Sequence, residues 1–383
     1  MSPDSCRYLG RLLVFGNAFP LRPLSLILAL ALPSPGVKGA RPGSPHPSHP
    51  DYKLVWQDEF SGNKLDRSKW RAVDDPSRGA YGHGNGEAQA YLDAEGRTFR
   101  VKEGRLTVTA HYDPGAIYPL RDKSDGSVTK KTSGQDFASA KLTTEELHSF
   151  TYGIVEARIR NPIADRSEKT AIPVWPAFWM LPETSTAPYD GYWDKTALNE
   201  KREWARSTWP YSGEIDIMEM SGRATRLYHA GAVYHTSAKR WTVGHIGWYS
   251  HYRRYDGAID PKQWVADQKL DGSLQPQPGQ KSYVSGYHTY GCKWTADQLI
   301  FMLDGKEWGP GLKLGDHTRF GGKKIYRNYP FYLILNLAIG GNYFGVWGPE
   351  DPGPDKKRPN ELYDFTQFPQ SMQVDWVRVY QKP

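Results

Sequence analysis

Alternation of apolar and polar residues with period two recurs along this chain and favours strands over helices. In the segment 153–160, Val155, Ala157 and Ile159 share one face, and three charged residues lie on the other. Further strands are expected near residues 105–110, 228–235, 286–294, 299–303, 331–337 and 372–380. Helical periodicity is nearly absent, with one short candidate near residues 190–207. The sequence therefore predicts an all-β fold.

Length and composition agree with one large β domain. The chain has 383 residues, and its 38 Gly and 29 Pro suit many turns between short strands. Repeats and a second domain are not evident. Aromatic residues make up 13% of the chain, and about half are expected in the core. The others could cover the flat C–H faces of sugars, since aromatic rings suit such surfaces.

The segment Gly213–Glu219 carries three carboxylates in an apolar, β-prone run. Side chains in a strand alternate faces, so Glu214 and Asp216 share a face and Glu219 should point the other way. A β-bulge, which inserts one extra residue, would return Glu219 to the face of the other two. The alternative is an acidic strand face that does no more than contact solvent.

Two glutamates on one face can perform retaining glycoside hydrolysis. One attacks the anomeric carbon and the other protonates the leaving oxygen, which requires carboxyls about 5–5.5 Å apart. The Cα atoms of Glu214 and Glu219 would lie about 13 Å apart, so the side chains must lean together. Asp216 could bond to either and share a proton, because crowded carboxylates do not all ionise readily. The residues alone leave open which glutamate is the nucleophile.

Seven colinear motifs surround this strand, between about residues 52 and 380. They are Leu54–Phe60, Asn85–Tyr91, Tyr152–Arg158, Trp175–Leu181, Tyr287–Thr295, Leu335–Asn342 and Val374–Tyr380. With the E-x-D-x-x-E run of Glu214, Asp216 and Glu219, they resemble the laminarinase-like branch of glycoside hydrolase family 16. The resemblance implies a concanavalin-like β-jelly roll, a sandwich of two curved antiparallel sheets whose concave sheet carries the cleft.

The resemblance also implies roles for the three carboxylates. Glu214 is the expected nucleophile and Glu219 the acid/base, with its pKa raised by acidic neighbours. Asp216 is expected to orient the first and modulate the second. The implied reaction is endo-hydrolysis of a laminarin-type β-1,3-glucan or a mixed β-1,3/1,4-glucan with retention. The alternatives are a galactan hydrolase of the same family (agarase, porphyranase or carrageenase) and a non-catalytic β-glucan-recognition protein, although such proteins commonly lose these carboxylates.

Substrate contacts are expected from aromatic and polar residues of the motifs. Any of the aromatic residues could instead belong to the core. His235 is interpreted as a substrate contact, because no second His stands at metal-ligand spacing. The predicted sugar-stacking residues are Trp175, Trp179 and Trp209, and the predicted polar contacts are Asn85, Glu87, His235 and Asn336. One departure from the family lies nearby: Ala140-Lys141 replaces a common Gly-Arg pair.

No cofactor is expected for catalysis, and charge gives little indication of another partner. The net charge is +7, but no compact basic cluster interleaved with aromatic residues suggests nucleic acid. The family resemblance implies a structural calcium ion on the convex face, held by backbone oxygens and one aspartate. Its matching positions are Glu59, Gly104 and Asp375. Calcium prefers such oxygen ligands.

The N-terminus has the order of a secretory signal. Three arginines precede the apolar run Leu24–Leu32, and small residues follow to Gly39–Ala40. The apolar run is too short for a stable membrane-spanning helix. We expect a signal segment at 1–40, a disordered Pro-rich linker at 41–50 and one catalytic domain at 51–383. A secreted or periplasmic monomer is expected, although an uncleaved anchor is an alternative.

A single cysteine and two long segments are the remaining features of the sequence. Cys292 is alone in the expected mature chain and is predicted to be a buried small hydrophobe. Segments 183–211 and 248–283 are longer than the family's core requires. Loops of this length are usually functional or disordered, and the first is expected near the rim of the cleft.

Overall fold

The structure is a computed structural model of the chain. It describes in full residues 43–74, 87–114, 136–162, 173–183, 214–220, 286–307, 314, 328–340 and 365–383. It describes the backbone of the strands at 120–121, 128–129, 228–237, 240–247, 312–313, 319–320 and 323–324. The expected signal segment, the candidate helix at 190–207 and most of both long insertions lie outside these residues.

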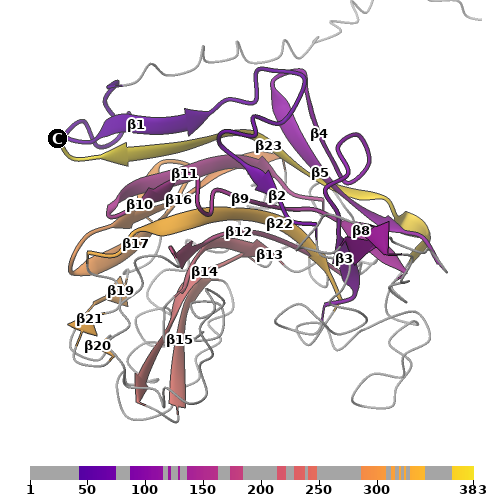
Figure 1. Ribbon diagram of the computed structural model, residues 1–383. Helices are drawn as coiled ribbons and strands as arrows, with labels where there is room; N and C mark the ends of the chain where they lie inside the picture. The colour runs from indigo at the N-terminus through magenta and orange to yellow at the C-terminus, as the bar shows by residue number, and fades with distance from the viewer. Residues whose placement is uncertain are drawn as a thin grey trace, which may run out of the picture. The chain divides into compact units, whose positions relative to one another are not determined.

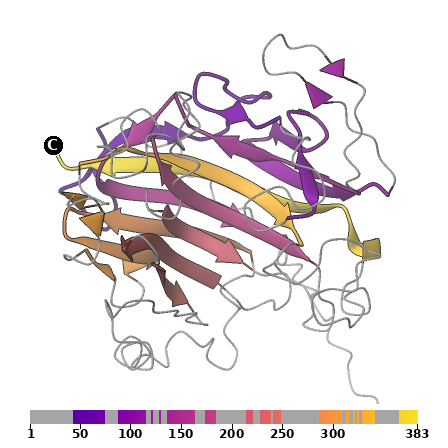
Figure 2. The same cartoon turned by 60° about the horizontal axis from the view of Figure 1, so that its bottom comes forward.

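Two stacked sheets build the fold (Figures 1 and 2). The first, with eleven strands, has the order β18-β17-β16-β11-β23-β5-β8-β3, with β1 on β23, β4 on β5 and β19 on β17. Its strands are β1 (Lys53–Asp58), β3 (Gln89–Tyr91), β4 (Phe99–Lys102), β5 (Arg105–Tyr112), β8 (Phe137–Ser139), β11 (Gly153–Arg160), β16 (Tyr287–Trp294), β17 (Gln298–Leu303), β18 (Lys306–Glu307), β19 (Leu312–Lys313) and β23 (Gln370–Gln381).

The second sheet, with eight strands, carries the acidic strand. Its order is β15-β14-β13-β12-β22-β9-β2, with β10 on β22. Its strands are β2 (Arg71–Ala72), β9 (Lys141–Thr143), β10 (Ser149–Phe150), β12 (Val174–Pro182), β13 (Glu214–Met220), β14 (Tyr228–Ser237), β15 (Arg240–Gly247) and β22 (Phe331–Ile339). Two small hairpins join β6 (Leu120–Arg121) to β7 (Val128–Thr129) and β20 (Arg319–Phe320) to β21 (Lys323–Lys324).

The predicted all-β class is confirmed. Among the described residues the single helical element is the 3₁₀ turn Phe365–Gln367, and β3–β8 is the one parallel pair. Within the same residues, no helix has the length and apolar character that a membrane crossing requires.

The core lies between the sheets. Val155, Ala157 and Ile159 of β11 are buried there, as their alternation predicts. Leu335 and Leu337 of β22 join them from the second sheet. The central position of β22, between β12 and β9, buries all nine of its residues. Cys292 is also buried in this core, as predicted, and burial raises the pKa of its thiol.

The described part of the expected linker is not disordered. Residues 43–50 fold back on β1, where Gly43 N–H donates to Leu54 O at 2.8 Å and His46 N–H donates to Tyr52 O at 2.8 Å. Pro45 forms a β-bridge with Lys53. The prediction of a linker was therefore wrong for residues 43–50. Its Pro-rich composition suggested a linker, but its backbone still has donors and acceptors that pair with a neighbouring strand.

A buried histidine fixes this segment to the outer face of the 11-stranded sheet, the face that points away from the core. His46 Nδ1 accepts the backbone N–H groups of Ser48 and His49, both at 3.1 Å, so its Nε2 carries the hydrogen. Nε2 lies 3.1 Å from Oε2 of Glu156 on β11, and both side chains are buried. Gly291 makes room, because a Cβ there would lie 2.8 Å from Glu156 Cγ.

Replacement of His46 by Ala should lower the free energy of unfolding by about 2 kcal/mol, because it leaves the Glu156 carboxylate buried without this donor. His49→Ala is the matched control, since His49 is only partly buried and should cost less. Denaturant unfolding of the whole chain measures both. Equal losses would show that the His46–Glu156 contact does not anchor the segment.

Candidate active site

A β-bulge shapes the acidic strand. Ala177 of β12 pairs with Glu219, and Trp179 pairs with Asp216, so two steps along β12 match three steps along β13. The β13–β14 register shifts over the same interval. Glu219 and Asp216 therefore share the face of Ala177 and Trp179, and Glu214 lies there too, two residues before Asp216. The bulge predicted from the sequence is present.

Asp216 is the most protected of the three carboxyls. It is 4% exposed. Burial raises its pKa well above the usual value, and the charges of Glu214 and Glu219 and a hydrogen bond with Glu214 act in the same direction. A protonated Asp216 is a hydrogen-bond donor, and its partner is the Glu214 carboxylate. Asp216 can therefore hold Glu214 in place as an acceptor.

Glu219 differs from an ordinary glutamate by its proton affinity. Burial raises the pKa of Glu219 to about 7; a hydrogen bond from Trp175 opposes the shift, and the charge of Glu87 adds to it. Trp175 Nε1 donates to Glu219 Oε1 at 2.9 Å, which leaves Oε2 to carry the proton. A carboxyl that retains its proton near neutral pH is suited to general acid catalysis.

A cross-strand row extends the site across three further strands. In register, Lys141 of β9 pairs with Asn336 of β22, Asn336 with Ala177, and Ala177 with Glu219. Neighbouring strands lie about 4.8 Å apart and directly paired residues share a face. Ala177, between Asn336 and the acid, contributes only a methyl group and is buried.

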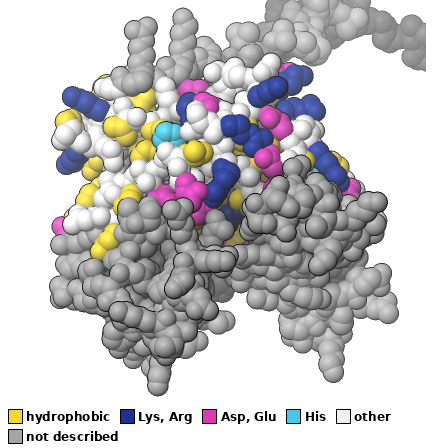
Figure 3. Space-filling view, viewed as in Figure 1, with side chains coloured by type: hydrophobic (Ala, Val, Ile, Leu, Met, Phe, Trp, Pro, Cys, Tyr) yellow, Lys and Arg dark blue, Asp and Glu magenta, His cyan; other side chains and the backbone are white. Residues whose placement is uncertain are grey.

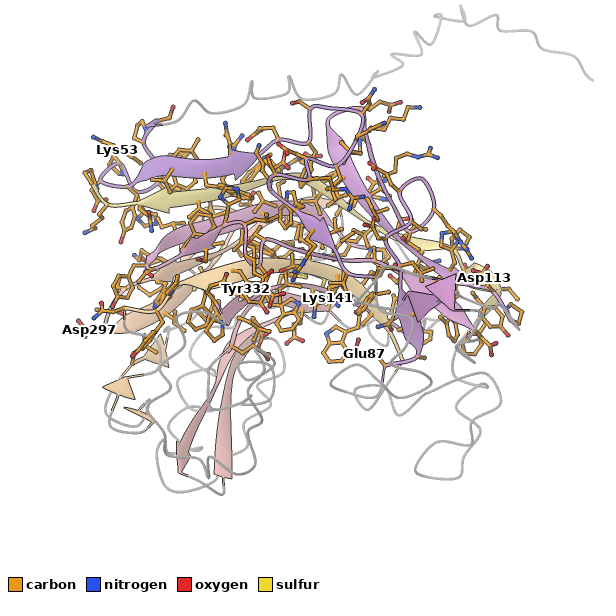
Figure 4. The ribbon with its side chains drawn as sticks, in the orientation of Figure 1. Lys53, Glu87, Asp113, Lys141, Asp297 and Tyr332 are labelled. Carbon is orange, nitrogen blue, oxygen red and sulfur yellow. The ribbon has the colours of Figure 1, made fainter. Side chains whose placement is uncertain are left out.

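Trp179 stands beside this row and is held from two sides. Its Nε1 donates to Asn336 Oδ1 at 2.6 Å, and Lys141 Nζ lies 4.9 Å from the ring centre. Figure 4 labels Lys141 and Glu87 beneath β22, on the side away from the 11-stranded sheet. Trp179 as a whole is only partly buried.

The other predicted contacts divide into three groups. Glu87 and Asn336 are buried and are joined through the hydroxyl of Tyr91. Trp175 is only 9% exposed, and its indole N–H is bonded to Glu219. Asn85 and Trp209 lie outside the described residues. His235 pairs with Trp241 in the backbone of β14–β15, but its side chain is outside the description.

Tyr91 and Lys141 were missed as site residues. The sequence held a signal for the first: Glu87, Gln89 and Tyr91 stand two residues apart and therefore share a strand face. Lys141 was noted only as a departure from the family. Its position over Trp179 depends on pairing between strands nearly two hundred residues apart in sequence, which alternation within one strand does not reveal.

Known β-glucanases are similar to this chain in sequence and in fold. No family model matches the sequence. The chain is 29% identical over 337 residues to the glucan endo-1,3-beta-glucosidase A1 of Niallia circulans, covering 86% of this chain and 38% of that protein. It is 28% identical over 340 residues to the beta-glucanase of Rhodothermus marinus, covering 86% of each. The solved structure of SCLam, a non-specific endo-beta-1,3(4)-glucanase from family GH16, superposes with a TM-score of 0.55 at 26% identity, covering 89% of this chain and 96% of that one.

In sequence and in fold, this chain is similar to laminarinase-like enzymes of glycoside hydrolase family 16. The jelly-roll class expected from the resemblance agrees with the two sheets described above. The acidic β13 strand, in the middle of the 8-stranded sheet, is accordingly the candidate active site of a glycoside hydrolase.

The side chains at two of the expected calcium positions, Glu59 and Asp375, are paired with arginines. Both carboxylate oxygens of Glu59 accept hydrogen bonds from Arg378, at 2.7 and 3.0 Å. Asp375 is ion-paired with Arg158. Among the described residues, no group of three or more His, Cys, Asp or Glu side chains could hold a metal. Any calcium here would have to compete with a guanidinium for the one expected aspartate, so calcium stays a prediction.

Charges on the described surface are mixed. Figure 3 shows Lys and Arg side chains interspersed with Asp and Glu on the face in view. No extended basic patch stands out there, which agrees with the interpretation of the net charge as a property of the solvated surface.

Proposed function

We propose that this protein is a secreted endo-acting β-1,3-glucanase that also accepts mixed β-1,3/1,4-glucan. The observation that carries the proposal is the bulge in β13, which places Glu214, Asp216 and Glu219 on one face. The relatives named above act on β-1,3- or β-1,3(4)-glucans by their descriptions. The N-terminal signal pattern supports export.

The proposed reaction is a double displacement. Glu214 attacks the anomeric carbon while Glu219 gives its proton to the glycosidic oxygen, and the leaving sugar departs with that proton. A glycosyl ester on Glu214 results. Glu219, now ionised, takes a proton from water; the water oxygen attacks the same carbon and frees Glu214. Two inversions retain the anomeric configuration.

The surrounding residues suit the two steps. Asp216 donates to Glu214 and so orients the attacking carboxylate, while its burial disfavours a third negative charge in the cluster. Trp175 fixes one oxygen of Glu219. Trp179, held by Asn336 and Lys141, offers an aromatic face beside Asp216 on which a sugar ring can stack.

A galactan hydrolase is the second candidate, because the chain is also 25% identical over 337 residues to the keratan-sulfate endo-1,4-beta-galactosidase of Sphingobacterium multivorum. A panel of laminarin, lichenan, curdlan, agarose and κ-carrageenan, with products sized over time, separates the candidates. We expect internal cuts in laminarin and lichenan. Activity on a galactan with none on laminarin would contradict the substrate assignment, and binding to laminarin without new reducing ends would favour a recognition protein.

A further inference from the structure

The Glu87 carboxylate is held by donors whose directions are fixed. Gln89 Nε2 donates to Glu87 Oε2 at 2.8 Å, and Tyr91 OH donates to the same oxygen at 3.2 Å. The side-chain amide of Gln89 cannot be flipped without losing a hydrogen bond, because its Oε1 accepts the backbone N–H of Ile339 at 2.7 Å. Its amide nitrogen must therefore face Glu87.

The Tyr91 hydroxyl is oriented in the same way. Trp179 Nε1 has only a hydrogen to offer, so the Asn336 oxygen faces Trp179 and the Asn336 nitrogen faces Tyr91. Asn336 Nδ2 donates to Tyr91 OH at 2.9 Å, and the hydroxyl passes its own hydrogen to Glu87. Every donor in this chain points toward Glu87, which is the arrangement that favours a carboxylate anion at its end.

Backbone pairing connects the Glu87 segment to the strand whose Trp175 bonds to the acid/base. The next residue, Ala88, donates its N–H to Ile339 O at 2.8 Å. Ile339 pairs with Val174 at the start of β12. The following residue of β12 is Trp175, which bonds to Glu219. The charge of Glu87 accordingly acts on Glu219, where it favours the protonated form.

We propose that Glu87 is a positioning residue whose fixed negative charge keeps the proton on Glu219 until the glycosidic oxygen takes it, and that Gln89 and Tyr91 hold that charge in place. This deepens the proposed function, on which it rests. Glu87 also connects the acid to Trp179, the expected sugar-stacking residue. Tyr91, Asn336 and Trp179 form one hydrogen-bonded chain that ends at Glu87.

Other charged groups lie on the strand of Glu219, on the neighbouring strand or in its cross-strand row. Glu214 and Asp216 lie on its own strand, and Lys141 lies three strands away in the same row. His229 of β14 stands opposite Glu219 in register, and its side chain is outside the described residues. All of these residues are kept in the Glu87 variants, and Glu87→Asp, which retains the charge, separates the effect of the charge from a rearrangement of its neighbours.

The test compares Glu87→Gln and Glu87→Ala with Glu87→Asp, which retains the charge. The carboxyl of Glu219 is followed by ¹³C NMR titration of glutamate-labelled protein without substrate and assigned with Glu219→Gln. Removing one charge should move the Glu219 titration about 0.5–1 pH unit lower, and the alkaline limb of the kcat/KM profile on laminarin should follow. The aspartate variant should stay near the parent.

Controls separate this role from others. Glu103→Gln changes an exposed charge in the β4–β5 turn of the other sheet and should leave the titration in place, since solvent screens it. An unshifted Glu219 titration in the folded neutral variants would overturn the proposal, as would the same shift in Glu87→Asp. A uniform loss of kcat/KM with an unmoved limb would mean that Glu87 only contacts sugar. The titration needs no substrate, so it stands even if the glucanase proposal fails.

Discussion

Glu214→Gln and Glu219→Gln should each lower kcat on laminarin by about 1,000-fold or more, with the fold intact. The first removes the nucleophile and the second removes the proton donor, and general acid catalysis alone is typically worth about 10²–10⁴. In the parent enzyme, kcat/KM should fall as the pH rises through about 7, because Glu219 must carry its proton to act as an acid.

A substrate with a good leaving group distinguishes the two variants. An aryl glycoside needs little protonation to depart, so Glu219→Gln should regain much of its first step and accumulate the glycosyl ester, whereas Glu214→Gln should not. Azide then replaces water in the second step and restores turnover of Glu219→Gln. If azide rescued Glu214→Gln and not Glu219→Gln, Glu219 would be the nucleophile and Glu214 the acid/base. Full activity in either variant would exclude that glutamate from the mechanism.

Asp216→Asn is the second large effect that we expect. The amide keeps a donor for Glu214 but removes a buried ionisable group from between the two glutamates, and kcat should fall by about 100-fold with KM nearly unchanged. The reason is that the side chain orients and tunes its neighbours and does not bind the sugar. Steady-state kinetics and circular dichroism of the same samples measure activity and folding. A changed KM with a normal kcat would show that Asp216 contacts substrate.

Local sequence patterns predicted much of the fold and the centre of the site. Val155, Ala157 and Ile159 alternate in sequence and are buried in the structure, because one face of β11 packs on the core. The bulge in β13 followed from the requirement that Glu219 share a face with Asp216. Both inferences concern residues within one strand. The first needs only the period of two, whereas the second also needed the chemistry of paired glutamates, because period two alone places Glu219 on the opposite face.

Features that depend on distant segments were not predicted. His46 looked like part of a linker, and its role follows from contact with Glu156, 110 residues away. The Tyr91–Asn336 bond joins residues 245 apart. Lys141 reaches Trp179 only because β9 and β12 both flank β22. No periodicity in the sequence indicates which strands become neighbours in a sheet, so these contacts became visible only in the fold.

The most direct test of the central claim is ¹H NMR of laminarin during the first minutes of hydrolysis. Retention predicts that the new reducing ends appear first as the β-anomer and reach the α/β equilibrium only later by mutarotation. Products sized in parallel should be internal fragments. New reducing ends that appear first as the α-anomer would contradict the double displacement by Glu214 and Glu219.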